Sequence, residues 1–214
     1  MPELVVTQLV NGRFAENCWL LGDAETHDAV LIDPGEEPAR FLAAVHSGGW
    51  RVNAVWLTHA HIDHVLGVPE VRSATGAPVL LHPSDRPLYD GVSAQAQWMG
   101  FEAANLPAPD GELVPGDTLS VGGLRFTVRH TPGHSPGSVS FVGHGRIFGG
   151  DVLFRESIGR TDLPGGDFFT LMRSIHAEFL VLPDATIVHS GHGPDTTIGA
   201  ERVDNPYLAG AIRA

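Results

Sequence analysis

Residues 58–64 read T-H-A-H-I-D-H and gather three histidines and one aspartate in a single short stretch. They continue from the apolar run 52–58, which we predict to be a buried strand. Neutral imidazole and carboxylate groups are the ligands that borderline divalent metals prefer. The first two histidines point to the same side of an extended chain, whereas Asp63 and His64 follow a bend and can face a second point. The stretch therefore predicts a metal site where a strand leaves its sheet. A polar helix start with solvated histidines is the alternative.

Four adjacent donors cannot complete two coordination spheres, so further ligands are expected elsewhere in the chain. Three candidates each follow a predicted strand and lie in a glycine-rich turn, where glycine lets the backbone approach an ion closely. Taken singly, each residue fits a solvent-facing turn about as well, and taken together they favour a shared site. The three are His134 in T-P-G-H-S-P-G, Asp151 after two glycines, and His192 in S-G-H-G.

The order of four motifs, T-H-x-H-x-D-H, T-P-G-H-S-P-G-S, G-G-D-x-L-F and G-H-G-P, resembles that of metallo-β-lactamase-fold hydrolases. Segments 150–162 and 196–207 are most similar to the compact, glyoxalase II-like (hydroxyacylglutathione hydrolase-like) branch of that superfamily. The resemblance covers essentially the whole chain. It implies an α/β fold, an αββα four-layer sandwich formed by residues 1–214 as a single domain, with the active site at one edge of the two sheets.

The resemblance also implies which residues bind which metal. His59, His61 and His134 would hold one ion, Asp63, His64 and His192 the other, and Asp151 would bridge them. We expect two divalent metal ions, zinc first, although iron and manganese accept the same nitrogen and oxygen ligands. A water molecule shared by two such ions ionises near neutral pH, and the hydroxide would attack a carbonyl. Asp63, as the catalytic residue, would orient that nucleophile and accept its proton.

These expectations favour a metal-dependent hydrolase of small thioesters of the acylglutathione type, because a thiolate leaves with little help from a general acid. Glyoxalase II has a helical C-terminal domain that supplies much of its glutathione site, whereas 22 residues follow His192. We therefore expect glutathione recognition to differ.

Two other hypotheses belong to different functional classes. One is an iron-dependent oxygenase of the persulfide dioxygenase type, with a single metal on two histidines and a carboxylate. The other is a metal-binding module without enzymatic activity. Seven histidine and aspartate ligands without a cysteine favour an open catalytic site over a closed structural one.

The net charge and the composition limit the kinds of partner that the protein is expected to bind. Against 25 Asp and Glu residues there are 13 Lys and Arg, a net charge of −12, which repels phosphate backbones and anionic membranes. We expect a small-molecule substrate, no nucleic acid and no membrane; the sequence leaves the oligomeric state open. No apolar run approaches the ~20 residues of a transmembrane helix, and the N-terminus lacks a signal-peptide pattern. The single cysteine, Cys18, excludes an internal disulfide. Together these features predict a cytoplasmic protein.

Hydrophobic periodicity predicts short strands alternating with a few helices. Residues 84–111 are rich in Pro, Gly, Asp and Ala, and we predict that they form a long surface loop that serves as a lid over the site. The predicted strands are 4–10, 17–22, 29–33, 52–58, 78–82, 118–121, 125–131, 138–142, 146–148 and 186–190, and the predicted helices are 37–47, 69–75 and 168–179.

Four residues are candidates for substrate contact. Arg155 and Arg160 follow Asp151 and either meet substrate carboxylates or brace their own loop. Tyr89 and Trp98 lie in the predicted loop with Met99 and Phe101. They either line the binding site of an apolar substrate or anchor the loop to the core.

A serine nucleophile and a reactive thiol are both disfavoured. Residues 133–137, G-H-S-P-G, match the nucleophile elbow of α/β-hydrolases, but the residue after Ser135 is Pro136, which has no N–H for an oxyanion hole. The residues that follow also read as a strand rather than a helix. Cys18 lies in an apolar strand without electropositive neighbours and is expected to be buried and unreactive.

Overall fold

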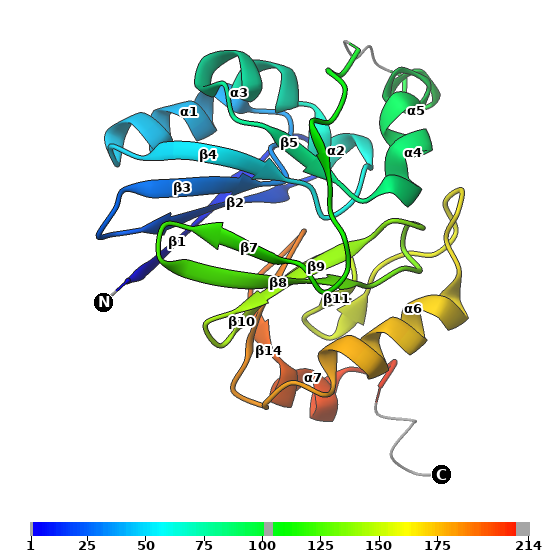
Figure 1. The fold of residues 1–214 in the computed structure, drawn as a ribbon. Helices are drawn as coiled ribbons and strands as arrows, with labels where there is room; N and C mark the ends of the chain where they lie inside the picture. The colour runs from blue at the N-terminus through cyan, green and yellow to red at the C-terminus, as the bar shows by residue number, and fades with distance from the viewer. Residues whose placement is uncertain (1, 101–104, 209–214) are drawn as a thin grey trace.

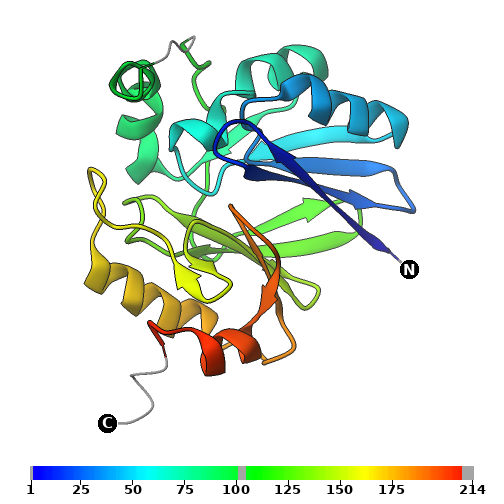
Figure 2. The ribbon, with the colours of Figure 1, turned by 180° about the vertical axis from the view of Figure 1, so that it is seen from behind.

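Two six-stranded sheets lie face to face, and helices cover the outer face of each (Figure 1). We describe residues 2–100 and 105–208 from a computed structural model of the chain. Seen from behind, α1 (Pro38–Ser47) and α3 (Val68–Thr75) lie on one outer face, and α6 (Phe168–Ser174) and α7 (Ile198–Asp204) lie on the other (Figure 2). The αββα sandwich expected from the sequence is confirmed.

The first sheet is built almost entirely from the N-terminal half of the chain. Its strands follow one another in sequence order, antiparallel at first and parallel from the third strand onward. The parallel strands send their carboxyl ends to one edge of the sheet. The strands are β1 (Leu4–Asn11), β2 (Glu16–Asp23), β3 (Asp28–Ile32), β4 (Arg51–Trp56), β5 (Val79–Leu81) and β6 (Gly111–Glu112).

The second sheet has the order β14-β13-β10-β9-β8-β7. Only β10 and β13 run parallel to each other, and the remaining neighbours are antiparallel. A separate two-stranded ribbon, β11 (Leu153–Phe154) and β12 (Ser157–Ile158), follows β10. The strands of the sheet are β7 (Thr118–Val121), β8 (Leu124–His130), β9 (Val139–Gly143), β10 (Arg146–Gly150), β13 (Ile187–Ser190) and β14 (Thr196–Thr197).

Strands in the middle of the sandwich are buried on both faces, and their side chains alternate between two cores. In β2, Cys18 and Leu20 join the core under the first helix layer, while Trp19 and Leu21 join the core between the sheets. In β10, Ile147 packs toward α6 and Phe148 packs between the sheets, so that this segment also has two apolar faces. This explains why these strands read as continuous apolar runs.

The prediction of an irregular loop over residues 84–111 was wrong for its first half. The chain forms a 3₁₀ turn, η1 (Pro83–Asp85), and two short helices, α4 (Arg86–Asp90) and α5 (Val92–Trp98). Tyr89, Val92 and Ala96 are buried from these helices into the first helix-side core. Their spacing of three and four residues is helical, but the surrounding Pro, Gly and Asp residues obscured it. Residues 101–104, including Phe101, lie outside the described residues.

Two further short helical elements complete the layers. α2 (Ile62–Val65) begins inside the histidine-rich stretch, and a π-helical turn, η2 (Ile175–Phe179), extends α6. In the described part of the chain, no helix has both the length and the apolar character that crossing a bilayer requires.

Candidate metal centre

The seven candidate ligands follow the ends of four strands that meet at one edge of the sandwich. His59 and His61 come shortly after β4, His134 lies between β8 and β9, Asp151 directly follows β10, and His192 follows β13. α2 turns the chain at once, so that Asp63 and His64 return toward the same point. Each candidate therefore has the strand-end position that the sequence predicts, and the structure brings all seven together.

The first group consists of His59, His61 and His134, whose ring nitrogens lie within 4.8 Å of one another. The Nδ1 atom of His61 and the Nε2 atom of His134 are 2.7 Å apart. All three side chains are buried or nearly so. Three imidazoles aimed at one point match the three protein ligands of a catalytic zinc site.

The second group consists of Asp63, His64 and His192. Asp63 Oδ2 lies 3.2 Å from His192 Nε2 and 3.7 Å from His64 Nε2. Asp151 lies between the two groups, because its Oδ2 is 3.5 Å from His134 Nε2 and 3.6 Å from His192 Nε2. This is the position that a bridging carboxylate requires.

Hydrogen bonds fix the tautomers of His59 and His64. Thr58 Oγ1 donates its proton to Asp33 Oδ2 at 2.5 Å and therefore accepts the Nδ1–H of His59 at 3.0 Å. Asp33 Oδ2 also accepts the Nδ1–H of His64 at 3.1 Å. With the proton held on Nδ1, the Nε2 lone pair of each ring points to the centre, as metal-binding histidines require.

The same holds for His134 and His192, with backbone carbonyls as the acceptors. His134 Nδ1 donates to the carbonyl of Arg160 at 2.8 Å, and His192 Nδ1 donates to that of Phe14 at 3.1 Å. A carbonyl oxygen only accepts, so the Nε2 atoms of these two rings carry no proton in the neutral form. Four of the five histidines are thus oriented by a partner outside the cluster.

Metal ions would satisfy atoms that the described residues leave without partners. The Nε2 atoms of His59 and His64 and the Oδ1 atom of Asp151 are buried and have no hydrogen-bond partner among the described residues. Buried polar groups are normally paired, and an unpaired one costs about 1–3 kcal/mol. Three such atoms at one point fit a bound cation, and the donor set of imidazoles and carboxylates suits a divalent transition metal.

The charge of the cluster also favours cations. Burial lowers the pKa of His59 well below its ordinary value and that of His61 to about 3, so both rings are neutral at physiological pH. Burial also acts to lower the pKa of His64, but the carboxylates of Asp63 and Asp151 raise it well above its ordinary value. Without metal, the carboxylates therefore favour a proton on His64, and a bound cation would take the place of that proton.

Asp33 forms a third compact group with His59 and His64. Its oxygens already accept the backbone N–H of Thr58 at 2.7 Å as well as the Thr58 and His64 protons. We therefore assign it to support rather than to metal binding. Its position at the end of a predicted strand, on the edge that carries His59, was a signal that the sequence analysis did not use.

Two glycines let the backbone pass close to the cluster. Gly150 has φ +51°, and a Cβ on it would overlap the Thr58 hydroxyl. A Cβ on Gly191 would overlap Asp151 Oδ1. The glycine-rich turns therefore have the role predicted for them, which is close approach of the chain to the ligands.

A pocket of about 850 Å³ opens above the cluster, with His61, Asp63, His134, Asp151 and His192 at its floor. Of the four predicted substrate contacts, Trp98 and Arg160 line it. Tyr89 does not, because it is buried and its hydroxyl donates to the carbonyl of Pro107 at 2.9 Å.

Arg155 also lies outside this pocket. It lines a separate hollow, where its guanidinium donates to the carbonyl of Asp195. Tyr89 anchors its helix and Arg155 braces its loop, which were the alternatives open for them; their inclusion among the substrate contacts was wrong.

A model of the metallo-β-lactamase superfamily matches residues 11–192. The chain belongs to that superfamily. It is 37% identical over 199 residues to "Hydroxyacylglutathione hydrolase GloC" of Haemophilus influenzae, covering 91% of this chain and 93% of that protein. It is 40% identical over 186 residues to "Probable metallo-hydrolase YqgX" of Bacillus subtilis, covering 85% and 87%.

Solved structures of the superfamily superpose closely. "BLEG-1 B3 metallo-beta-lactamase" matches with a TM-score of 0.90 at 39% identity over 96% of this chain and 100% of that one. "TTHA1623 in a di-iron-bound form" matches with 0.87 at 43% identity over 94% and 100%. "ETHE1 from Myxococcus xanthus" matches with 0.80 at 32% identity over 96% and 85%. The chain is accordingly a metallo-hydrolase by family, and these relatives leave its substrate open.

Asp85, which the sequence analysis did not single out, ties two ligand-bearing loops of this superfamily member together. It is fully buried in η1. Its Oδ2 accepts the backbone N–H of Ala60 at 2.9 Å and the Ser135 hydroxyl at 2.7 Å, and its Oδ1 accepts the N–H of Gly137 at 2.6 Å. Ala60 lies between two candidate ligands, and Ser135 and Gly137 follow His134 by one and three residues. Asp85 therefore fixes the spacing of the first group.

The Asp85→Asn variant is expected to bind metal about tenfold more weakly, the lower end of the loss seen when outer partners of metal ligands are changed. The amide NH₂ of asparagine donates hydrogen bonds and cannot accept them, so at least one of the three donors loses its acceptor. Chelator competition on purified protein measures the affinity. Asp90→Asn, which removes an exposed carboxylate paired with Arg86, is the matched control. Equal metal affinity in the two variants would contradict the role of Asp85 in positioning the ligands.

The same contacts decide the status of Ser135. Its hydroxyl is buried against Asp85 and Ser138 and does not line the pocket, in agreement with setting it aside as a nucleophile. Cys18 is also buried, and burial raises the pKa of its thiol well above the ordinary value. The expectation that Cys18 is buried is confirmed, and the low reactivity of its thiol stays a prediction.

Proposed function

We propose that this protein hydrolyses small thioesters of the acylglutathione type with two divalent metal ions, zinc in the first instance. In this proposal His59, His61 and His134 hold one ion, Asp63, His64 and His192 hold the other, and Asp151 bridges them. The observation that carries the proposal is the convergence of five imidazole rings and two carboxylates at the floor of an open pocket. Open metal sites with nitrogen and oxygen ligands are typical of catalysis.

Two such ions, when bound, supply an ionised water at neutral pH and polarise a carbonyl. The residues of the chain position the substrate carbonyl and the attacking water relative to each other. Asp63 is partly exposed at the pocket floor, with Oδ2 against His192. Although burial raises the pKa of Asp63, the neighbouring His64 and His192 lower it below its ordinary value. Asp63 therefore stays ionised and available to orient the attacking water and accept its proton.

Thioesters suit this arrangement of residues better than amides do. A leaving amine must be protonated, and in this pocket its proton would have to come from Asp63 or from a histidine of the cluster. A leaving thiol has an ordinary pKa of about 8.5 and departs as the thiolate. The relative named hydroxyacylglutathione hydrolase is consistent with this choice.

A second candidate is a persulfide-oxidising oxygenase with one iron. It is consistent with the donor set, because histidine and carboxylate ligands also suit iron, and one similar structure is named in an iron-bound form. One metal would need only one histidine-rich group. It would leave the second group of Asp63, His64 and His192 without a purpose, so we rank this function below hydrolysis.

The test is a direct comparison of the two reactions on purified, metal-loaded protein. We expect release of free thiol from a lactoyl or acetyl thioester and no oxygen uptake with a persulfide. A β-lactam is the third substrate to include, because one similar structure is named as a B3 metallo-β-lactamase. Oxygen uptake without thiol release would reverse the ranking, and β-lactam opening without thiol release would change the substrate class.

A further inference from the structure

The walls of the pocket above the candidate ligands are mainly apolar. One wall is formed by α4 and α5, and the other by the segment that follows Asp151. Both ribbon views place these two segments at the same end of the sandwich, on either side of the sheet edge (Figures 1 and 2). The side chains that form the walls include Leu88, Trp98 and Met99 on the first and Phe154, Leu163 and Pro164 on the second.

The main polar side chain on the helical wall is already fully engaged. The Gln95 Nε2 atom donates to the carbonyls of Ala60 at 3.2 Å and Leu88 at 2.8 Å, and its Oε1 accepts the backbone N–H of Ile62 at 3.1 Å. These bonds tie α5 to the histidine-rich stretch. They leave the amide without a free donor for a ligand, since both protons are used.

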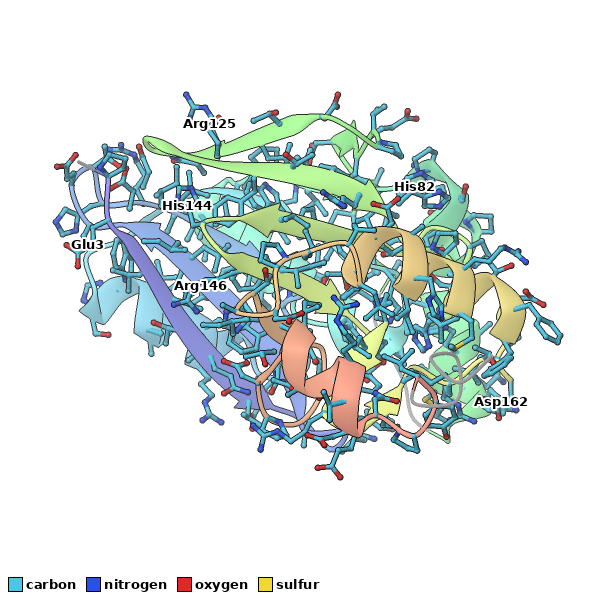
Figure 3. All side chains as sticks on the ribbon, turned by 90° about the horizontal axis from the view of Figure 1, so that it is seen from below. Glu3, His82, Arg125, His144, Arg146 and Asp162 are labelled. Atoms are coloured by element: carbon cyan, nitrogen blue, oxygen red, sulfur yellow. The ribbon has the colours of Figure 1, made fainter. Side chains whose placement is uncertain are left out.

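Positive charge on the walls is scarce. The sequence contains no lysine, and Arg160 is the one arginine among the described residues that line the pocket. Its Nε and Nη2 atoms donate to the two carboxylate oxygens of Asp162 at 2.7 and 2.8 Å. Asp162 lies at the outer edge of the molecule, at the opposite end from Glu3 (Figure 3). The fork of the guanidinium is thus occupied by a partner within the chain.

A glutathione moiety carries two carboxylates, and this pocket offers them no unpaired cation among its described residues. Placing a carboxylate against apolar walls without a partner is unfavourable. An apolar chain gains from the same walls, because each buried methylene is removed from water. The volume of about 850 Å³ is at the upper end of the range for small-molecule sites, and it leaves room well beyond the reacting carbonyl.

We infer that the substrate is a thioester with an uncharged, apolar acyl chain that lies between the α5 wall and the 154–164 wall, and that the thiol portion is recognised without its charges. This inference rests on the proposed hydrolysis of thioesters, and it replaces glutathione with an uncharged thiol as the leaving group that the pocket favours. It makes Trp98 a specificity-determining residue, because its ring is 73% exposed and faces the pocket.

The test is a series of thioesters of one neutral thiol, N-acetylcysteamine, with acetyl, butanoyl, hexanoyl and octanoyl chains. We expect kcat/KM to rise about two- to four-fold for each added methylene up to hexanoyl. Hexanoyl-glutathione should be no better a substrate than the neutral hexanoyl thioester. A flat or falling series, or a preference of tenfold or more for the glutathione thioester, would overturn the inference.

A matched pair of variants assigns the effect to the wall. Trp98→Ala should at least halve the gain in kcat/KM per methylene, and the metal content of the variant reports whether the centre is intact. Phe169→Ala is the control, because Phe169 is 71% exposed on α6 and does not line the pocket; it should keep the wild-type series. Loss of chain-length dependence in both variants, or in neither, would contradict the role of Trp98.

Binding to metal-depleted protein separates this inference from the proposed function. Straight-chain alcohols from butanol to octanol should quench or shift Trp98 fluorescence with a dissociation constant that falls with each methylene, and a Trp98→Phe variant should lack the signal. Chain-length-dependent binding without thioester hydrolysis would keep the apolar pocket and reject the hydrolase. Hydrolysis of the acetyl thioester with no chain-length-dependent binding would keep the hydrolase and reject the inference.

Discussion

The His59→Ala variant is expected to hydrolyse thioesters at less than about one thousandth of the wild-type rate. The imidazole of His59 is buried, and its Nε2 atom has no other partner among the described residues. Without it, the first group is reduced to His61 and His134. A metal ion can lower the pKa of bound water from 15.7 to about 7, so loss of the ion removes the nucleophile at neutral pH.

Steady-state thiol release by wild type and variant measures this loss, with circular dichroism to show that the variant is folded. His46→Ala, which truncates an exposed histidine on α1, is the matched control and should keep full activity. Chelation of the wild-type protein should produce the same loss, reversed by added metal. Turnover near the wild-type rate in folded His59→Ala would refute the assignment of the site.

Asp63→Asn should lower kcat by about a hundred- to ten-thousand-fold, the range over which general bases contribute. The substitution keeps the size of the side chain and removes the charge that orients water and accepts its proton. Because the apolar walls remain, KM should change much less than kcat. Asp184→Asn, at an exposed carboxylate that pairs with Arg202, is the control.

Metal content must be measured on the same sample of Asp63→Asn, because Asp63 is also a proposed ligand. A variant that retains its metal and its wild-type kcat would remove Asp63 from the catalytic step. A variant that loses one ion together with its activity would assign Asp63 to binding alone.

The sequence was sufficient for the fold and for the position of the ligands, because both follow from local patterns. The apolar runs predict strands, and His134, Asp151 and His192 each follow one of them directly. Strands that end at one edge of the sandwich bring the side chains that follow them together. Ligands far apart in the chain therefore converge because of the fold, although no single motif encodes their contact. The resemblance of four ordered motifs supplied the pairing of ligands.

The residues that the sequence analysis missed or misassigned depend on tertiary contacts. Asp85 has no local pattern, since its partners lie 25 residues before it and about 50 after it. Arg155 and Arg160 lie five residues apart in one segment, yet the intervening ribbon directs one away from the pocket and leaves the other at its wall. Tyr89 and Trp98 are both aromatic and both helical, and only the packing of α4 and α5 buries one and exposes the other.

The central claim is that seven side chains hold two metal ions, and metal analysis of the purified protein by mass spectrometry tests it most directly. After metal depletion, reconstitution and removal of excess metal, we expect close to two divalent ions per wild-type chain and fewer in the His59→Ala variant. A wild-type chain that binds one ion or none under these conditions would contradict it.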